Sequence, residues 1–353
     1  MSTDPGLAGD SCIYVEAIAN DGGIHNAAGV WWFSPDLDIN PMTPNHGNAV
    51  SDADNNVVVT VRKRSNCTLP PGTESILVDV FVCDPAMGVP HPSDPVTQLK
   101  RINPVNTPQT PNSIPPANIP SGGSTPLPIT WHPLSTSTDA DRPGPHKCLI
   151  VRTYPNSLSP DGGDFHVPDD PHVAQHNLAI IATSKPSPAP REELFHFNIS
   201  TTNPNRQEAQ AATIRIVADL SPAKNVIDFL IPRLQEINGF RRIANLGLPQ
   251  GFNLRLPDFP NATVQNNSRL GFLGFLLYLL FLLLSFLGIR IQFPFTQPKY
   301  EAQIQLQPGQ FTTFTFEVDL SSAQRGDAHV FHLMHVGPDQ RVIGGFTVVP
   351  VVV

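Results

Sequence analysis

Residues 57–83 read VVVTVRKRSNCTLPPGTESILVDVFVC, and this stretch decides the fold. Two runs rich in Val, Ile and Phe, 57–62 and 76–83, flank a turn that contains Pro70, Pro71 and Gly72. Residues of these types favour extended strands, while Pro and Gly favour the turn that connects them. The stretch therefore predicts two antiparallel strands, each with one face in a core.

Strand-like runs of the same kind recur along the chain between clusters of Pro, Gly, Asn and Asp. The other runs are 12–19, 148–154, 173–182, 194–199, 212–219, 300–306, 311–320, 329–336 and 342–349. The chain has 39 prolines in 353 residues, which excludes a mainly helical protein because an interior proline removes a backbone donor. A net charge of −8 without a basic cluster argues against a nucleic-acid partner. The sequence predicts a mainly β protein.

The arrangement of these runs predicts two β-sandwich modules, 1–183 and 194–353, joined by the Pro/Ser-rich linker 184–193. The first module contains a proline-rich excursion over 85–145, which we expect to carry edge strands only. The second is interrupted by a helical and apolar insertion over 221–295. Its first part, from Ser221 to Gly239, has helical spacing of apolar residues and a helix-start signal.

The two halves share a pattern, which predicts two copies of one antiparallel β-sandwich. Residues 69–82 and 306–320 each place an alternating strand after a Pro-Gly turn, and 144–154 resembles 326–336. Residues 31–39 (WWFSPDLDI), 57–85 and 147–180 are similar to CARDB-type immunoglobulin-like modules of bacterial surface and uncharacterised proteins. This resemblance implies a sandwich used for adhesion, spacing or assembly, without shared catalytic residues. The proline-rich excursion and the insertion depart from the family pattern.

The segment LGFLGFLLYLLFLLLSFLGI (270–289) has 20 residues without a charge and predicts an apolar helix. Three burial sites are open: other subunits, a membrane, or the interior of the same chain. A single membrane crossing would separate strands of the second sandwich, so burial against other copies fits the strand order best. The residues expected to form the assembly or membrane helix are Leu270, Phe272, Phe275, Leu276, Leu279, Leu280, Leu283, Phe286 and Leu287.

The loop PDGGDFHVPDDPHVAQHN (160–177) is the richest polar cluster of the sequence. Its carboxylates can supply oxygen ligands to Ca²⁺, while His166, His172 and His176 suit a transition metal. The candidate Ca²⁺ ligands are Asp161, Asp164, Asp169 and Asp170. Asp and Gly are also typical of plain turns, so a loop that binds no metal is the alternative. No other cofactor is expected.

Three further histidines occur in GDAHVFHLMHV (326–336). Strand alternation puts His329 and His335 on one face and His332 on the other, so they are not expected to share one metal. Cys83 and Cys148 lie in apolar runs typical of buried thiols, and Cys12 and Cys67 can pair only in an oxidising compartment. The amino terminus shows no cleavable signal peptide.

The sequence contains no nucleophile elbow, phosphate-binding loop or dinucleotide motif, so we expect no enzyme. It predicts a structural protein that self-assembles into a filament, tube or oligomer through the apolar helix and the proline-rich arm. The alternative is a membrane-anchored surface module or pore-forming effector that places 270–289 in the bilayer. The compartment is then the cell surface, reached by a non-classical route, or a membrane.

Overall fold

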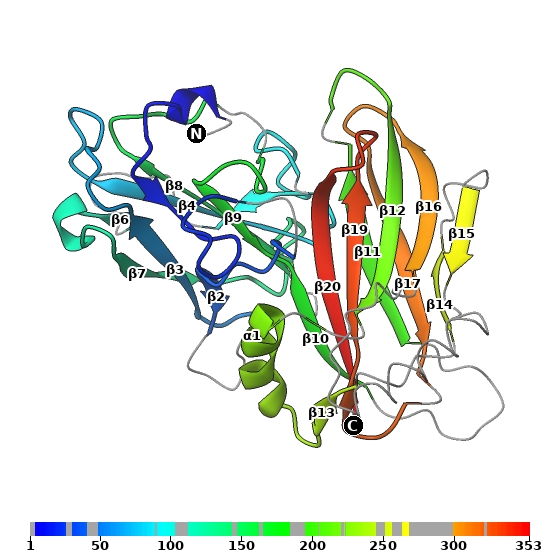
Figure 1. Cartoon of the computed structure of the whole chain (residues 1–353). Coiled ribbons are helices and arrows are strands. Elements are labelled where there is room, and N and C mark those ends of the chain that lie inside the picture. Colours follow the sequence, from blue (N-terminus) through cyan, green and yellow to red (C-terminus); the bar gives the residue numbers. More distant parts are fainter. Residues whose placement is uncertain are drawn as a thin grey trace, which may run out of the picture.

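A computed structural model gives the structure of the chain. It describes residues 4–25, 30–40, 49–88, 90–102, 112–142, 147–161, 165–183, 195–203, 205–219, 222, 224–244, 251–255, 263–267, 299–320 and 323–353. The described part is mainly β, as predicted, with largely antiparallel sheets that form two sandwiches side by side (Figure 1). The helices are the short η1 (Pro5–Leu7) and η2 (Pro116–Asn118), and α1 (Lys224–Gln235).

The amino-terminal sandwich consists of two sheets that enclose one apolar core. The β3 sheet contains β1 (Ile13–Tyr14), β2 (Leu37–Ile39), β3 (Asn55–Lys63) and β7 (Ser124–Trp131). The β4 sheet contains β4 (Ile76–Cys83), β5 (Lys100–Arg101), β6 (Ser113–Ile114), β8 (Cys148–Pro155) and β9 (Val173–His176). Val57, Val59 and Val61 of β3 share this core with Val78 and Val80 of β4. The alternation seen in residues 57–83 thus fills the space between the sheets.

The carboxy-terminal sandwich packs a three-stranded sheet against a larger one. The β17 sheet contains β11 (Phe195–Thr202), β14 (Gly251–Arg255) and β17 (Phe311–Asp319). The β20 sheet contains β10 (Leu178–Thr183), β12 (Gln210–Asp219), β13 (Arg242–Ile243), β15 (Thr263–Asn267), β16 (Lys299–Leu306), β18 (Asp327–Ala328), β19 (Val330–Val336) and β20 (Val342–Val352). Ring contacts between Phe316 and Phe331 and between Phe197 and Phe346 join the two sheets.

Two neighbouring strands connect the sandwiches without a loop between them. Strand β9 belongs to the β4 sheet, and after the single residue Asn177 the chain continues as β10, which pairs in parallel with β20. Figure 1 shows β10 leaving the amino-terminal sandwich and lying alongside β20. Because β9 is paired in one sandwich and β10 in the other, with one residue between them, they fix the relative orientation of the sandwiches.

Side chains from both sandwiches interlock at this junction. Trp32 is buried and donates its indole N–H to the hydroxyl of Thr347 at 2.8 Å, while its ring lies against His332. Helix α1 contacts the amino-terminal sandwich through the ring of Phe229, which lies against Phe33. One apolar cluster therefore runs from the second sandwich onto the outer face of the β4 sheet.

The proline-rich excursion contributes only edge pairing in its described part. Strand β7 pairs with β3 alone, and Pro126 and Pro128 lie opposite Thr60 and Val58. The amide of Thr60 points away from β7, toward Asp36. The prolines therefore occupy positions where the ladder requires no N–H from them, as expected for an edge strand.

Three expectations about local structure are wrong. The strand expected over 12–19 shortens to Ile13–Tyr14, because Asp21 binds the amides of Ala17 and Ile18 at 2.9 Å and turns the chain. The insertion 221–295 is not only helical and apolar, since β14 pairs with β17 and β15 with β16. The two sandwiches also differ in strand order. Strand β4 pairs with β8 in one sheet, whereas β17 and β19, which match β4 and β8 in the sequence pattern, lie in different sheets.

Helix α1 confirms the predicted helix in the first part of the insertion. The apolar helix expected over 270–289 lies outside the described residues, as does the linker 184–193. Within the part of the chain that the structure describes, no helix is long and apolar enough to cross a membrane.

Candidate functional site

The described residues that flank the apolar segment lie side by side at one edge of the β20 sheet. Strands β15 and β16 are antiparallel neighbours, and Asn267 at the end of β15 lies opposite Lys299 at the start of β16. Paired Cα atoms in such a ladder are about 4.5–5.5 Å apart. The two described residues that bracket 268–298 are therefore direct neighbours. The nine apolar positions predicted for assembly, from Leu270 to Leu287, lie between these ends and outside the described residues.

The four predicted Ca²⁺ ligands have different surroundings. Asp164 lies outside the described residues. The backbone amide of Asp161 donates to Asp4, Asp169 is exposed and pairs with Arg341, and Asp170 is buried against His172. Among the described residues, no three His, Cys, Asp or Glu side chains are grouped to hold a metal. The Ca²⁺ site stays a prediction because it includes Asp164.

His172 is buried between two carboxylates near the amino terminus. Its Nδ1 lies 3.1 Å from Asp170 and its Nε2 lies 3.2 Å from Asp10. Burial acts to lower the pKa of His172, but hydrogen bonds and charges from Asp10 and Asp170 outweigh it and raise the pKa to about 8. The imidazolium thus joins the segment before β1 to the segment before β9.

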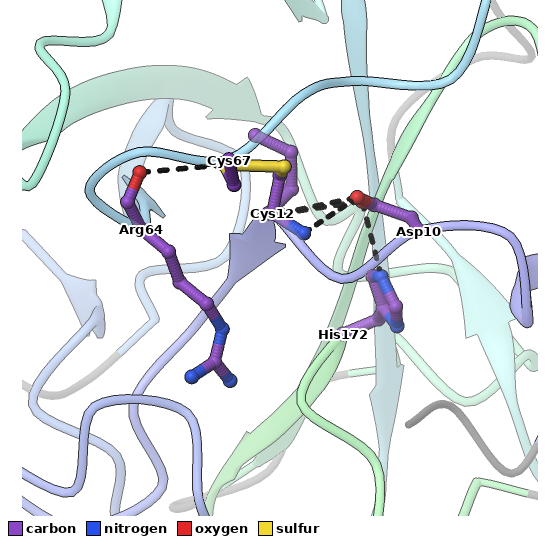
Figure 2. The surroundings of a disulfide bond; sticks show 6 residues. Asp10, Cys12, Arg64, Cys67 and His172 are labelled. Atoms are coloured by element: carbon purple, nitrogen blue, oxygen red, sulfur yellow. Dashed lines mark hydrogen bonds and ion pairs between the residues drawn. A yellow bond between two sulfur atoms is a disulfide. The ribbon is translucent and has the colours of Figure 1, made fainter.

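The carboxylate of Asp10 also contacts a cysteine that forms a disulfide bond. Asp10 accepts the backbone amide of Cys12 at 2.7 Å, and Cys12 is bonded to Cys67 (Figure 2). The thiol pair that the sequence allowed is therefore formed. Cys83 and Cys148 are buried and lie opposite each other in β4 and β8. The hydrogen bond to Cys148 and burial raise the pKa of the Cys83 thiol.

A Thr–His–Asp arrangement that no sequence motif indicated lies at the junction. His332 Nδ1 is 3.0 Å from the hydroxyl of Thr347, and its Nε2 is 3.0 Å from Asp219. This is the order of nucleophile, base and carboxylate found in hydrolases. However, Thr347 is completely buried and accepts the indole N–H of Trp32. A substrate carbonyl has no access to this hydroxyl, so the group holds the sandwiches together.

The three histidines of 326–336 do not converge. His335 faces the interior of its sandwich and contacts Thr201 of β11 at 2.9 Å, whereas His332 faces Trp32. Burial lowers the pKa of His335 to about 4. The opposite directions of His332 and His335 confirm the alternation expected from the sequence.

A cleft of about 260 Å³ opens at the junction between the loop that follows β8 and the hairpin that joins β19 to β20. Asp169 and Arg341 face each other across it, with 2.8 and 3.0 Å between the guanidinium Nη2 and the two carboxylate oxygens. Phe165, Val342 and Ile343 supply its apolar walls. Sequence reasoning found Asp169 but missed Asp339 and Arg341, because a β-hairpin turn carries the same residue types whether or not it borders a cleft.

Comparisons with known proteins give no family. No protein-family model and no curated protein sequence matches the chain. Among solved structures, the chain is similar to collagen adhesin (CNA) from S. aureus, with 10% identity, a TM-score of 0.20, and coverage of 89% of this chain and 91% of that one. The CupB6 tip adhesin from Pseudomonas aeruginosa shows 8% identity, a TM-score of 0.16, and coverage of 90% and 96%.

Proposed function

We propose that this chain is a non-enzymatic structural protein whose copies assemble, into a filament, tube or oligomer, by burying the apolar segment 270–289 against one another. One observation carries the proposal: Asn267 and Lys299, which bracket this segment, are paired in adjacent strands. In this proposal the rigid pair of sandwiches forms the body of each subunit and the segment forms the contact. Immunoglobulin-like sandwiches of the CARDB type and the proline-rich arm over 85–145 belong to the same proposal.

The pairing weighs against a single membrane crossing. A helix over 270–289 is about 30 Å long, which matches the hydrocarbon thickness of a bilayer. The nine residues from 290 to 298 would then have to return through lipid without a helix of comparable length, leaving backbone groups unsatisfied. Burial among subunits avoids this cost, because apolar side chains of neighbouring copies cover the segment.

An uncharged apolar segment of 20 residues needs a cover. Soluble monomers rarely expose continuous apolar patches larger than a few hundred Å². The exposed large apolar side chains of the described part are scattered and are Ile24, Val96 and Leu134. The Cys12–Cys67 disulfide supports assembly in an oxidising compartment, where disulfides persist.

The test compares particle size without detergent for the full chain and two variants. Leu279→Glu with Leu283→Glu places two charges in the apolar segment, and Ile24→Glu with Leu134→Glu adds two charges at exposed positions as a control. We expect large soluble particles for the unchanged chain and the control, and small subunits for the Leu279/Leu283 variant, by sedimentation velocity. Monomers of the unchanged chain, or recovery only with lipid vesicles, would contradict assembly and favour the membrane alternative.

A further inference from the structure

The cleft at the junction carries an inference that does not depend on assembly. Its walls contain the apolar residues Phe165, Pro168, Val342 and Ile343. The carboxylates of Asp169 and Asp339 also line it. A cavity of about 260 Å³ that combines apolar walls with a few placed polar groups has the character of a ligand site, at the size of one large side chain.

The charges around the cleft favour a cation. Asp169 and Arg341 neutralise each other through two contacts of 2.8 and 3.0 Å. Asp339 accepts the backbone amide of Arg341 at 3.1 Å, and it has no ion-pair partner among the described residues. The carboxylates and the guanidinium of the described lining therefore leave one negative charge, within a chain whose net charge is −8.

An unused acceptor lies in the same wall. The side-chain Oε1 of Gln210, at the start of β12, is buried and has no hydrogen-bond partner among the described residues. Buried polar atoms nearly always have a partner, so an unpaired acceptor on a side chain that lines a cavity gains one when that side chain turns toward a donor in the cavity. A ligand that carries N–H groups can supply it.

We propose that this cleft binds the cationic side chain of a polypeptide, a lysine ammonium or an arginine guanidinium. The aliphatic stem of such a side chain packs on Val342, Ile343 and Phe165, while its charged head reaches Asp339 and donates to Gln210. A neutral apolar ligand would leave both acceptors unpaired, and an anion would meet the uncompensated charge of Asp339.

Titration of the full chain with short peptides tests the site, with binding followed by the backbone amide signals of Gln210 and Arg341. We expect acetyl-Gly-Arg-Gly-amide to shift these signals at millimolar concentration, and its citrulline analogue, which lacks the charge, to bind more weakly. Asp339→Asn should weaken the arginine peptide by about threefold to fivefold, the range for an exposed ion pair. Glu74→Gln removes an exposed carboxylate that does not line the cleft and should leave binding unchanged.

A double variant tests whether the preference of the cleft for a cationic peptide can be reversed. Asp169→Asn with Asp339→Asn removes both carboxylates from the described lining of the cleft and leaves Arg341 in place, so the preference should change from the arginine peptide to acetyl-Gly-Glu-Gly-amide. Equal binding of the arginine and citrulline peptides, preference of the unchanged chain for the glutamate peptide, or no signal change up to roughly 20 mM peptide would overturn the proposal. None of these outcomes bears on particle size, so failure here is distinguishable from failure of assembly.

Discussion

The side-chain amide of Asn177 donates to the carbonyl oxygen of Gly345 at 3.0 Å and to that of Ala86 at 2.9 Å. Asn177 is completely buried at the point where β9 ends and β10 begins. Its backbone amide also donates to Trp32, and its carbonyl accepts from Thr347. One residue thus binds the segments that the two sandwiches contribute to their junction.

Asn177→Ala should destabilise the whole chain. The substitution removes one donor from each of two buried carbonyl groups, which keep only the longer contacts from Gln175 and Cys148. Each lost hydrogen bond contributes about 0.5–1.5 kcal/mol, so we expect a decrease of roughly 1–3 kcal/mol in the free energy of unfolding. Urea denaturation measures it. Asn198→Ala, at an exposed asparagine of β11, should stay within about 0.5 kcal/mol of the unchanged chain. Equal effects of the two substitutions would show that Asn177 does not hold the junction.

Gly344→Ala should also disrupt the junction, for a steric reason. A Cβ atom at Gly344 would overlap the backbone carbonyl of Met87, which cannot rotate away as a side chain does. Overpacking of this kind costs about 3 kcal/mol or more where backbone must move. The same change at Gly9, whose nearest neighbour would be a leucine methyl at 3.5 Å, is the matched control. Thermal unfolding followed by circular dichroism should give Gly344→Ala a much lower midpoint temperature than Gly9→Ala. A lower midpoint for Gly9→Ala would contradict the described contact.

Because of His172, the free energy of unfolding should decrease in mildly alkaline solution. Its pKa is about 8 in the folded chain and about 6.5 when unfolded, so the folded state holds the proton more tightly. The stabilisation is fully present below pH 6.5 and is lost as pH rises through 8, with a total of about 2 kcal/mol.

The measurement is the free energy of unfolding in urea at pH 6 and at pH 9. The unchanged chain should lose about 2 kcal/mol more than His172→Asn, which has no titrating group at this position. His132→Asn provides a control, since His132 lies at the exposed surface near Asp54. A pH response of His172→Asn as steep as that of the unchanged chain would assign the effect to other groups.

Reduction of the Cys12–Cys67 bond should destabilise the amino-terminal sandwich. The bond closes a loop with a sequence separation of 55 residues, for which the chain-entropy relation gives roughly 4 kcal/mol. Urea unfolding with and without a phosphine reductant measures the change. The variant Cys12→Ala/Cys67→Ala should already be destabilised and should not respond to the reductant. If that variant responds as strongly as the unchanged chain, the effect belongs to another pair of cysteines.

Most strands were predictable, because alternation of apolar residues follows from which face is buried. The runs 57–62 and 76–83 became β3 and β4, and 148–154 became β8, with bounds that differ by at most two residues. The run 12–19 failed, because the side chain of Asp21 takes the amides that a longer strand needs. The apolar pattern of 12–19 does not reveal this, because the acceptor is the side chain of Asp21, which lies outside the run.

The sites were less predictable than the strands. Asp169 was noticed in its loop, but its partner Arg341 comes from a hairpin 172 residues away in the sequence. The apolar run 173–182 predicts one strand, whereas Asn177 divides it between two sheets. Neither relation leaves a local signal, since both depend on which segments the fold brings together.

The amino-acid sequence by itself determined the mainly β class, the positions of most strands, helix α1 and the presence of an uncharged segment at 270–289. These features depend on local propensity and on the period of apolar residues. The tertiary structure alone decided how strands pair, that β10 joins the second sandwich, and that Asp169, Asp339 and Arg341 border one cleft. Alternation fixes which face of a strand is buried, while the choice of partner strand depends on contacts between distant segments that no local pattern encodes.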